Sequence, residues 1–226
     1  YLSANLPSEE ILQLTRKIGA DLIVIGSRGL GGLQRWLLGS VAERTVRRAP
    51  CPVLTVSAND AAESAPPDAN AGGKPIAAKE IQKILLPVDF SDSSQRAFDQ
   101  AIGLAQDFRA ELHLLHCYQL HRRMVAPYGI EIPESLEHDV RMAALRRLSD
   151  WREKATAHGI RVREHISAHF PSDEIPAMAA RIGANLIVMG TRGLTGLKHV
   201  LLGSVAERTM RAAPCPVLTV RCNRAR

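Results

Sequence analysis

Short apolar runs alternate with amphipathic segments along the chain from residue 81 onward. Residues 83–89 (KILLPVD) are an apolar run that ends at a carboxylate, as expected for a buried parallel strand, and further runs cover 111–118, 161–168, 186–189 and 216–220. Between the first two runs, apolar residues recur at helical spacing, and a long charged helix is expected over 134–157. This order predicts an α/β fold of three α/β/α layers, with a five-stranded parallel sheet covered on both faces.

Serines stand where three of the expected helices begin. Residues 91–94 (SDSS) offer N-cap candidates, Ser172 is expected to cap a helix through Ile182, and Ser204 to begin a helix that ends at Pro214. Ser204 and Glu207 also have the spacing of a capping box, and Ser40 and Glu43 repeat it.

An internal repeat is the most informative feature of the chain. Residues 1–56 align with residues 165–220 without a gap, at an offset of 190 − 26 = 164, and 36 of the 56 aligned positions are identical. The strand that begins near Ile81 has no counterpart, because 81 − 164 = −83. We therefore expect residues 1–56 to be the C-terminal half of a first domain and 81–222 to be a complete domain. Residues 57–80, rich in Ala, Pro, Gly, Asn and Asp, are expected to be a flexible linker, and 223–226 a tail.

Composition adds exclusions rather than a function. With 46% apolar and 23% charged residues the chain is typical of a folded globular protein, and no apolar run reaches the length of a membrane span. The four cysteines lack CxxC spacing, so we expect free thiols in a reducing, cytoplasmic setting. The net charge of +6 is spread along the chain, and aromatic residues are only 4%, which disfavours the stacking platforms of single-strand nucleic-acid binders.

The candidate chemistry follows the fourth apolar run. Gly190 and Gly193 are separated by two residues, nine more residues follow, and Gly203-Ser204 then opens a helix. Glycines permit close backbone approach and positive φ, and the free amides of a helix N-terminus attract anions. The sequence therefore predicts a phosphate site at the carboxyl edge of the sheet. The alternative is the capping box, which needs no ligand.

The pattern G-x2-G-x9-G-S, between a strand ending in LIVMG and a terminal APCPVLTV, resembles the universal stress protein family and specifically its ATP-binding branch. ILLPVDFSDSS at 84–94 is similar to the first strand and turn of that family. The resemblance covers 81–222 and the half-domain at 1–56. It implies a flavodoxin-like strand order 3-2-1-4-5, with ATP as ligand, with or without Mg2+.

Carried over residue by residue, the resemblance implies a site on the complete copy and part of a site on the first. Asp89 would contact the nucleoside end, although it is alternatively a cap of the following turn. Cys117 would line the adenine pocket where an aliphatic residue is more usual. The full set is Pro87, Val88, Asp89, Cys117, Met189, Gly190, Thr191, Arg192, Gly193, Gly203, Ser204 and Val205, with Gly26, Arg28, Gly29, Gly39, Ser40 and Val41 in the first copy. The first-copy site is expected not to close around a nucleoside.

Three functions remain open from the sequence. The first is an ATP-binding stress-response or signalling module, the second a slow ATPase or self-phosphorylating enzyme, and the third a nucleic-acid binder. No residue stands out as a general base, and His165 and His169 lie on a strand and its exit, which argues against a metal site. The resemblance also implies a homodimer or an intramolecular pairing of the tandem copies, with Val217–Val220 as the pairing edge.

Overall fold

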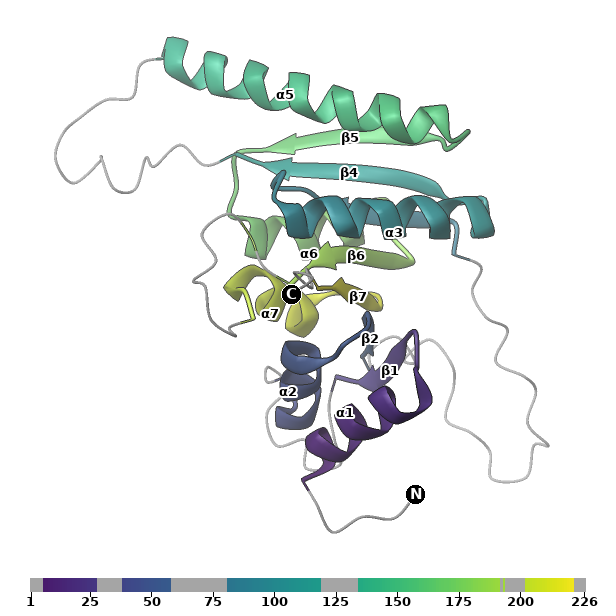
Figure 1. Cartoon of the computed structure of the whole chain (residues 1–226). Helices are drawn as coiled ribbons and strands as arrows, with labels where there is room; N and C mark the ends of the chain where they lie inside the picture. Colours follow the sequence, from purple (N-terminus) through teal and green to yellow (C-terminus); the bar gives the residue numbers. More distant parts are fainter. Residues whose placement is uncertain are drawn as a thin grey trace, which may run out of the picture.

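The computed structural model describes residues 6–27, 38–57, 81–118, 134–191, 193 and 202–221. Helices and strands alternate along these segments (Figure 1). Residues 1–56, called the first repeat below, contribute α1 (Pro7–Ile18), β1 (Ile23–Gly26), α2 (Ser40–Arg48) and β2 (Val53–Val56). Residues 81–222, called the second repeat, contribute β3 (Lys83–Pro87), α3 (Asp92–Phe108), β4 (Glu111–Cys117), α5 (Glu134–Ala157), β5 (Val162–Ser167), α6 (Pro171–Ile182), β6 (Leu186–Gly190), α7 (Ser204–Ala212) and β7 (Val217–Val220).

All seven strands of the described segments belong to one sheet, in the order β1-β2-β7-β6-β3-β4-β5. In Figure 1 the labelled strands of this sheet run from β1 at the bottom to β5 at the top. The five strands of the second repeat are all parallel and have the expected order 3-2-1-4-5. The sheet is larger than the five strands expected, because β2 of the first repeat pairs antiparallel with β7. The last strand is therefore a pairing edge, as the sequence indicated, and the pairing is between the two repeats of one chain.

Two hydrophobic cores lie on opposite faces of the sheet. On one face α3 and α5 cover β3, β4 and β6, with Leu86, Phe98 and Leu148 among the buried residues. On the other face α1, α2, α6 and α7 share a single core that includes Val46, Val53, Ile175 and Ile187. The first repeat is thus packed on the second through a common core as well as through the β2–β7 ladder.

The side chains that cap the helices differ from the sequence expectation in two places. Ser91 is the N-cap of α3 and accepts a hydrogen bond from the amide of Ser94, as expected. α6, however, begins at Pro171 after Phe170, and α7 has Gly203 as its N-cap, both without a side-chain cap. α7 begins at Ser204 as expected, but Ser172 and Ser204 are both helical residues and neither occupies the N-cap position. The capping box is therefore not formed, and Glu207 instead pairs with Arg211 one turn later.

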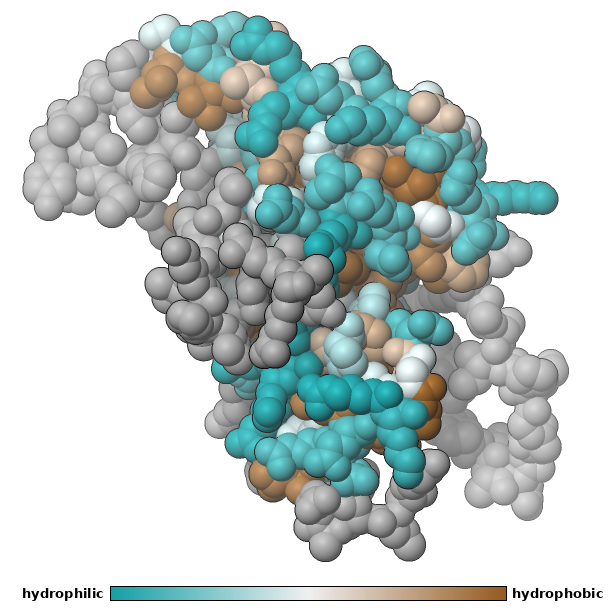
Figure 2. All heavy atoms as spheres, viewed as in Figure 1, coloured by the Kyte–Doolittle hydropathy of each residue, from teal (hydrophilic) through white to brown (hydrophobic). Residues whose placement is uncertain are grey.

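Some large apolar side chains stay on the surface of the described residues. Leu136 and Met142 are exposed on α5, where Figure 2 shows an apolar group at one end of the helix. Ile18, Leu22 and Val24 are exposed around β1. Within the described segments no helix combines the length and the apolar character needed to cross a membrane.

Candidate functional site

The exit from β3 is a tight turn built around Asp89. The carboxylate atom Oδ1 of Asp89 accepts hydrogen bonds from the amide of Ser91 at 3.0 Å and from its hydroxyl at 2.7 Å. Phe90, between Asp89 and Ser91, has a backbone φ of 64°, in the left-handed region that residues other than glycine rarely adopt. Asp89 therefore caps the turn into α3, which was the alternative to a ligand role, and the turn holds its carboxylate at the carboxyl edge of the sheet.

The exit from β6 approaches this turn closely at two glycines. A Cβ atom on Gly190 would lie 2.4 Å from Oγ of Ser93, and one on Gly193 would lie 2.7 Å from Oδ2 of Asp89. The positive φ expected for these glycines is absent, since the described glycines with positive φ are Gly19, Gly159 and Gly183. Close approach of the two chain segments, rather than backbone conformation, is thus the reason for glycine at both positions.

The start of α7 is fixed beside β6 by backbone hydrogen bonds. The amide of Gly203 donates to the carbonyl of Thr191 at 2.9 Å, and the amide of Thr191 donates to the carbonyl of Val220 at 3.1 Å. Ser204 and Val205 then open the helix, and no side chain caps its first amides. Amides of this kind carry the positive end of the helix dipole, so the position suits an anion.

The first repeat copies this arrangement. The amide of Gly39 donates to the carbonyl of Ser27 at 2.8 Å, and that of Ser27 to the carbonyl of Val56 at 2.8 Å. α2 likewise has a glycine N-cap without a side-chain cap, so Ser40 and Val41 open it as Ser204 and Val205 open α7. Gly26 ends β1. The two helix starts therefore have the same backbone geometry. Residues 1–56 contain no counterpart of Asp89.

The apolar side of the site comes from the strand ends. Val88 and Met189 are buried, and Cys117 is half-buried at the end of β4. Burial, with a smaller contribution from the carboxylate of Glu174, raises the pKa of the Cys117 thiol to about 12. The thiol is therefore neutral, and Cys117 acts as a small apolar side chain, as expected from the sequence.

Sequence reasoning missed an aromatic cluster behind the Asp89 turn. Nδ1 of His116 donates to the carbonyl of Val88 at 2.7 Å, and its ring lies 4.6 Å from that of Phe90. The guanidinium of Arg147 stands 4.1 Å from the centre of the Phe90 ring, and Trp151 meets Phe90 edge-on. These residues come from three separate segments, so no local pattern in the sequence signals their contact. They hold Phe90, and with it the Asp89 turn, in place.

Part of the expected site lies outside the described residues. Arg192, Arg28 and Gly29 belong to this part, so their expected roles stay predictions. Pro87, at the end of β3, and Thr191, buried beside the start of α7, lie at the same edge as the residues above.

A second polar cluster lies on strands β4 and β5. The rings of His113 and His165 are parallel within 5°, and Nδ1 of His113 lies 2.9 Å from Nε2 of His165. Oε2 of Glu111 lies 3.3 Å from Nε2 of His113, and the other oxygen accepts from Arg163 at 2.7 Å. A carboxylate can only accept, so Nε2 of His113 carries the proton and its Nδ1 accepts from His165. Within the described residues, no group of three or more His, Cys, Asp or Glu is placed to hold a metal ion.

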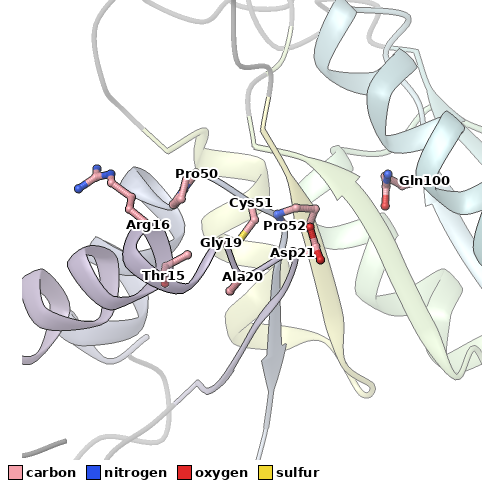
Figure 3. A pocket seen from close by; sticks show the side chains of 9 residues that line it. All are labelled: Thr15, Arg16, Gly19, Ala20, Asp21, Pro50, Cys51, Pro52 and Gln100. Carbon is pink, nitrogen blue, oxygen red and sulfur yellow. The ribbon is translucent and has the colours of Figure 1, made fainter.

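An open hollow of about 620 Å³ lies where the first repeat meets α3, apart from the residues assigned to the site. Figure 3 shows Cys51 and Pro52 on one side of it and Gln100 of α3 on the other. Cys51 is half-buried, and burial raises the pKa of its thiol.

Comparison with known proteins gives one consistent family. The model of the universal stress protein family matches residues 5–57 and 80–221. Universal stress protein YxiE of Bacillus subtilis is 34% identical over 150 residues, which cover 62% of this chain and 99% of YxiE. Universal stress protein Rv2005c of Mycobacterium tuberculosis is 30% identical over 202 residues, covering 89% of this chain but only 62% of its own length.

The similarity extends to solved structures. The crystal structure of a universal stress protein from Archaeoglobus fulgidus superposes with a TM-score of 0.63 at 25% identity. The match covers 95% of this chain and 65% of that protein. The chain therefore spans just under two thirds of the length of both the mycobacterial and the archaeal relative.

Proposed function

Because the chain belongs to the universal stress protein family, we propose that it binds ATP where the ends of β3 and β6 meet the start of α7. The observation that carries this proposal is the convergence of Asp89 with Gly193, next to a helix start that no side chain caps. A charged acceptor for hydroxyl groups and a set of free amide donors suit the two ends of a nucleotide.

In this proposal the phosphates bind the backbone of the loop and of α7. The amides of Gly203, Ser204 and Val205 are the donors, and glycine at 190 and 193 keeps the surrounding chain close. Arg192 would add charge-assisted hydrogen bonds, which Arg commonly makes to phosphate. A Mg2+ ion would arrive with the nucleotide and take most of its ligands from phosphate oxygens and water.

The nucleoside would lie against the strand ends of the second repeat. Asp89 would accept hydrogen bonds from ribose hydroxyls, and Cys117 and Met189, which belong to the same core, would provide an apolar lining for adenine, with Val88 next to Asp89 on the opposite face. Neutrality of the Cys117 thiol supports this role, since a thiolate would require water or a cation beside it.

The proposed output is that of a stress-response module. Bound ATP would favour one conformation or one partner contact through its higher affinity for that state. We propose that the protein acts in the cytoplasm. Its assembly would be either the pairing of the two repeats seen in this chain or a homodimer.

The direct test is calorimetric titration of ATP into the full chain, with Asp89→Asn as the site variant. An asparagine at 89 can keep its oxygen toward Ser91, which leaves an NH2 group that cannot accept from a ribose hydroxyl. We expect saturable heat and a thermal shift with ATP, and affinity lower by about tenfold in the variant. Asp99→Asn, on the exposed surface of α3, is the matched control and should bind as the unaltered chain does.

Absence of both heat and thermal shift at millimolar ATP would refute the proposal, as would unchanged binding by Asp89→Asn. A phosphate-release assay on the same samples separates the enzymatic alternative. A rate well above background that Asp89→Asn abolishes would make the chain an ATPase rather than a binding module.

A further inference from the structure

Equivalent strands of the two repeats have different neighbours. β6 lies between β3 and β7, and its edge toward β3 is paired in parallel, Ile84 with Leu186 and Leu85 with Ile187. β1 is its counterpart at the offset of 164 residues, and it pairs with β2. On its other edge β1 has no partner among the described strands.

The same comparison identifies an apolar surface beside this edge. Leu22 is 46% exposed, whereas its counterpart Leu186 is 4% exposed. Val24 is 61% exposed, whereas Val188, which α3 and β3 help to cover, is fully buried. We call the open edge of β1 with Ile18, Leu22 and Val24 the β1 edge surface. In the second repeat the equivalent surface is covered by a strand followed by a helix.

A polar anchor for a strand is also present at this edge. In the second repeat Oδ1 of Asn185 accepts hydrogen bonds from the amides of Gln82 at 3.0 Å and Lys83 at 2.9 Å, which sets where β3 begins. Its counterpart is Asp21, an exposed residue in the turn between α1 and β1 that Figure 3 shows beside Pro52. A carboxylate can accept from two amides as the Asn185 oxygen does, and more strongly because it is charged.

We propose that the β1 edge surface binds a strand–helix segment with the sequence pattern of β3 and α3. Its strand runs parallel to β1 and begins at Asp21, which accepts the first two amides. Its helix lays an apolar face over Leu22 and Val24. The apolar edge of β1 suits the addition of another strand. β5, at the other end of the sheet, carries the charged residues Arg163 and Glu164, which disfavour such pairing.

β3 of a second copy is not the occupant, since it is already paired on both edges, with β4 and β6. The partner is therefore a strand–helix segment with the sequence pattern of β3 and α3 that is not part of the described sheet. Two β1 edges pairing with each other is the competing arrangement, and the experiment separates the two.

The test uses the full chain and a synthetic peptide with the sequence of residues 80–110. We expect saturable binding by fluorescence anisotropy and slower amide exchange at Val24. The amide of Ile23 points toward β2, where it donates to Pro52, so the amide of Val24 points to the open edge. Asp21→Ala should weaken binding by about tenfold, and Asp21→Asn should retain it, as Asn185 indicates. Val24→Lys should abolish binding, and Leu136→Lys, which alters an exposed apolar residue on α5, should leave it unchanged.

The same segment joined to the N-terminus through a Gly/Ser linker provides a second readout that does not depend on peptide solubility. It should raise the melting temperature of the chain, and Asp21→Ala should remove most of that rise. Failure of both versions would overturn the proposal, as would peptide binding or stabilisation insensitive to Asp21→Ala. A dimer of the chain alone that Val24→Lys converts to monomer would establish edge-to-edge pairing instead.

Discussion

Leu54 and Leu218 occupy the same position in the two repeats and are paired with each other at the centre of the β2–β7 ladder. On either side of them, the hydroxyl of Thr55 donates to the carbonyl of Val217, and the hydroxyl of Thr219 donates to the carbonyl of Val53, each at 3.1 Å. Exchange of the repeats maps each contact onto the other. The junction therefore has the self-complementary character of an interface between two identical subunits.

This symmetry predicts equal costs for equivalent substitutions. Thr55→Val and Thr219→Val each remove one buried hydroxyl donor and keep the side-chain shape, so each should lower the free energy of unfolding by about 0.5–1.5 kcal/mol. Urea denaturation of both variants checks this. Thr156→Val, on the exposed face of α5, serves as the control and should change stability by less than about 0.5 kcal/mol. A large cost at only one of the two threonines would contradict the symmetry.

Alanine should have opposite effects at two glycines. Gly190→Ala places a methyl group against Ser93 and should destabilise the chain by about 1–3 kcal/mol. Gly103→Ala, inside α3 with open space around its Cβ position, should stabilise by about 0.5–1 kcal/mol, because alanine favours helix. Thermal or urea unfolding measures both. If both variants changed the stability equally, the chain after β6 could move to accept the methyl group. The close approach of Gly190 to Ser93 would then not be the reason for glycine there.

Aspartate at the two helix starts should separate folding from ligand binding. Gly203→Asp and Gly39→Asp each introduce a favourable N-cap, so neither helix should be lost, and because glycine is already an acceptable N-cap each should gain only about a few tenths of a kcal/mol. Under the proposed function, only Gly203→Asp places a negative charge where the ATP phosphates bind. We expect calorimetry to show loss of ATP binding for Gly203→Asp and unchanged binding for Gly39→Asp. Equal behaviour of the two variants would count against a site at α7.

Three histidines, the paired His113 and His165 and the separate His116, predict loss of stability on acidification. Burial lowers the pKa of His113, His116 and His165 below the usual value of about 6.5, so the unfolded chain binds protons that the folded chain does not. Stability is then complete above about pH 6.5 and falls as the pH decreases toward the folded-state pKa values. The pKa of Glu111 is lowered by its hydrogen bond with Arg163, so its contribution is lost only at lower pH, below about 4.5.

Urea unfolding between about pH 7 and pH 5 measures this effect. The double variant His113→Gln with His165→Gln should be less stable at neutral pH, because the pair loses its hydrogen bond, but its stability should depend less on pH. An unchanged slope in the double variant would show that these two residues do not carry the acid sensitivity.

Several features of the fold followed from local patterns. The alternation of apolar runs and helical spacing predicted the parallel sheet of the second repeat and the helix over 134–157, whereas the strand order was implied by the family resemblance. Among the N-cap candidates at 91–94, Ser91 is the cap, and α7 begins at Ser204 as expected. Neither Ser172 nor Ser204 is a cap, since a serine near a helix start looks the same in sequence whether it precedes the first turn or belongs to it. The site residues, chosen by resemblance, stay predictions that the titrations above test.

The sequence by itself determined the duplication, the apolar faces and the presence of glycines at the carboxyl edge, because each depends on residue order or on spacing within one segment. Only the tertiary structure decided that Gly193 is required by Asp89, that Phe90 is held between His116 and Arg147, and that the repeats share one sheet through Leu54 and Leu218. These contacts join segments far apart in the chain, and their geometry comes from strand register and helix packing, which no local pattern encodes.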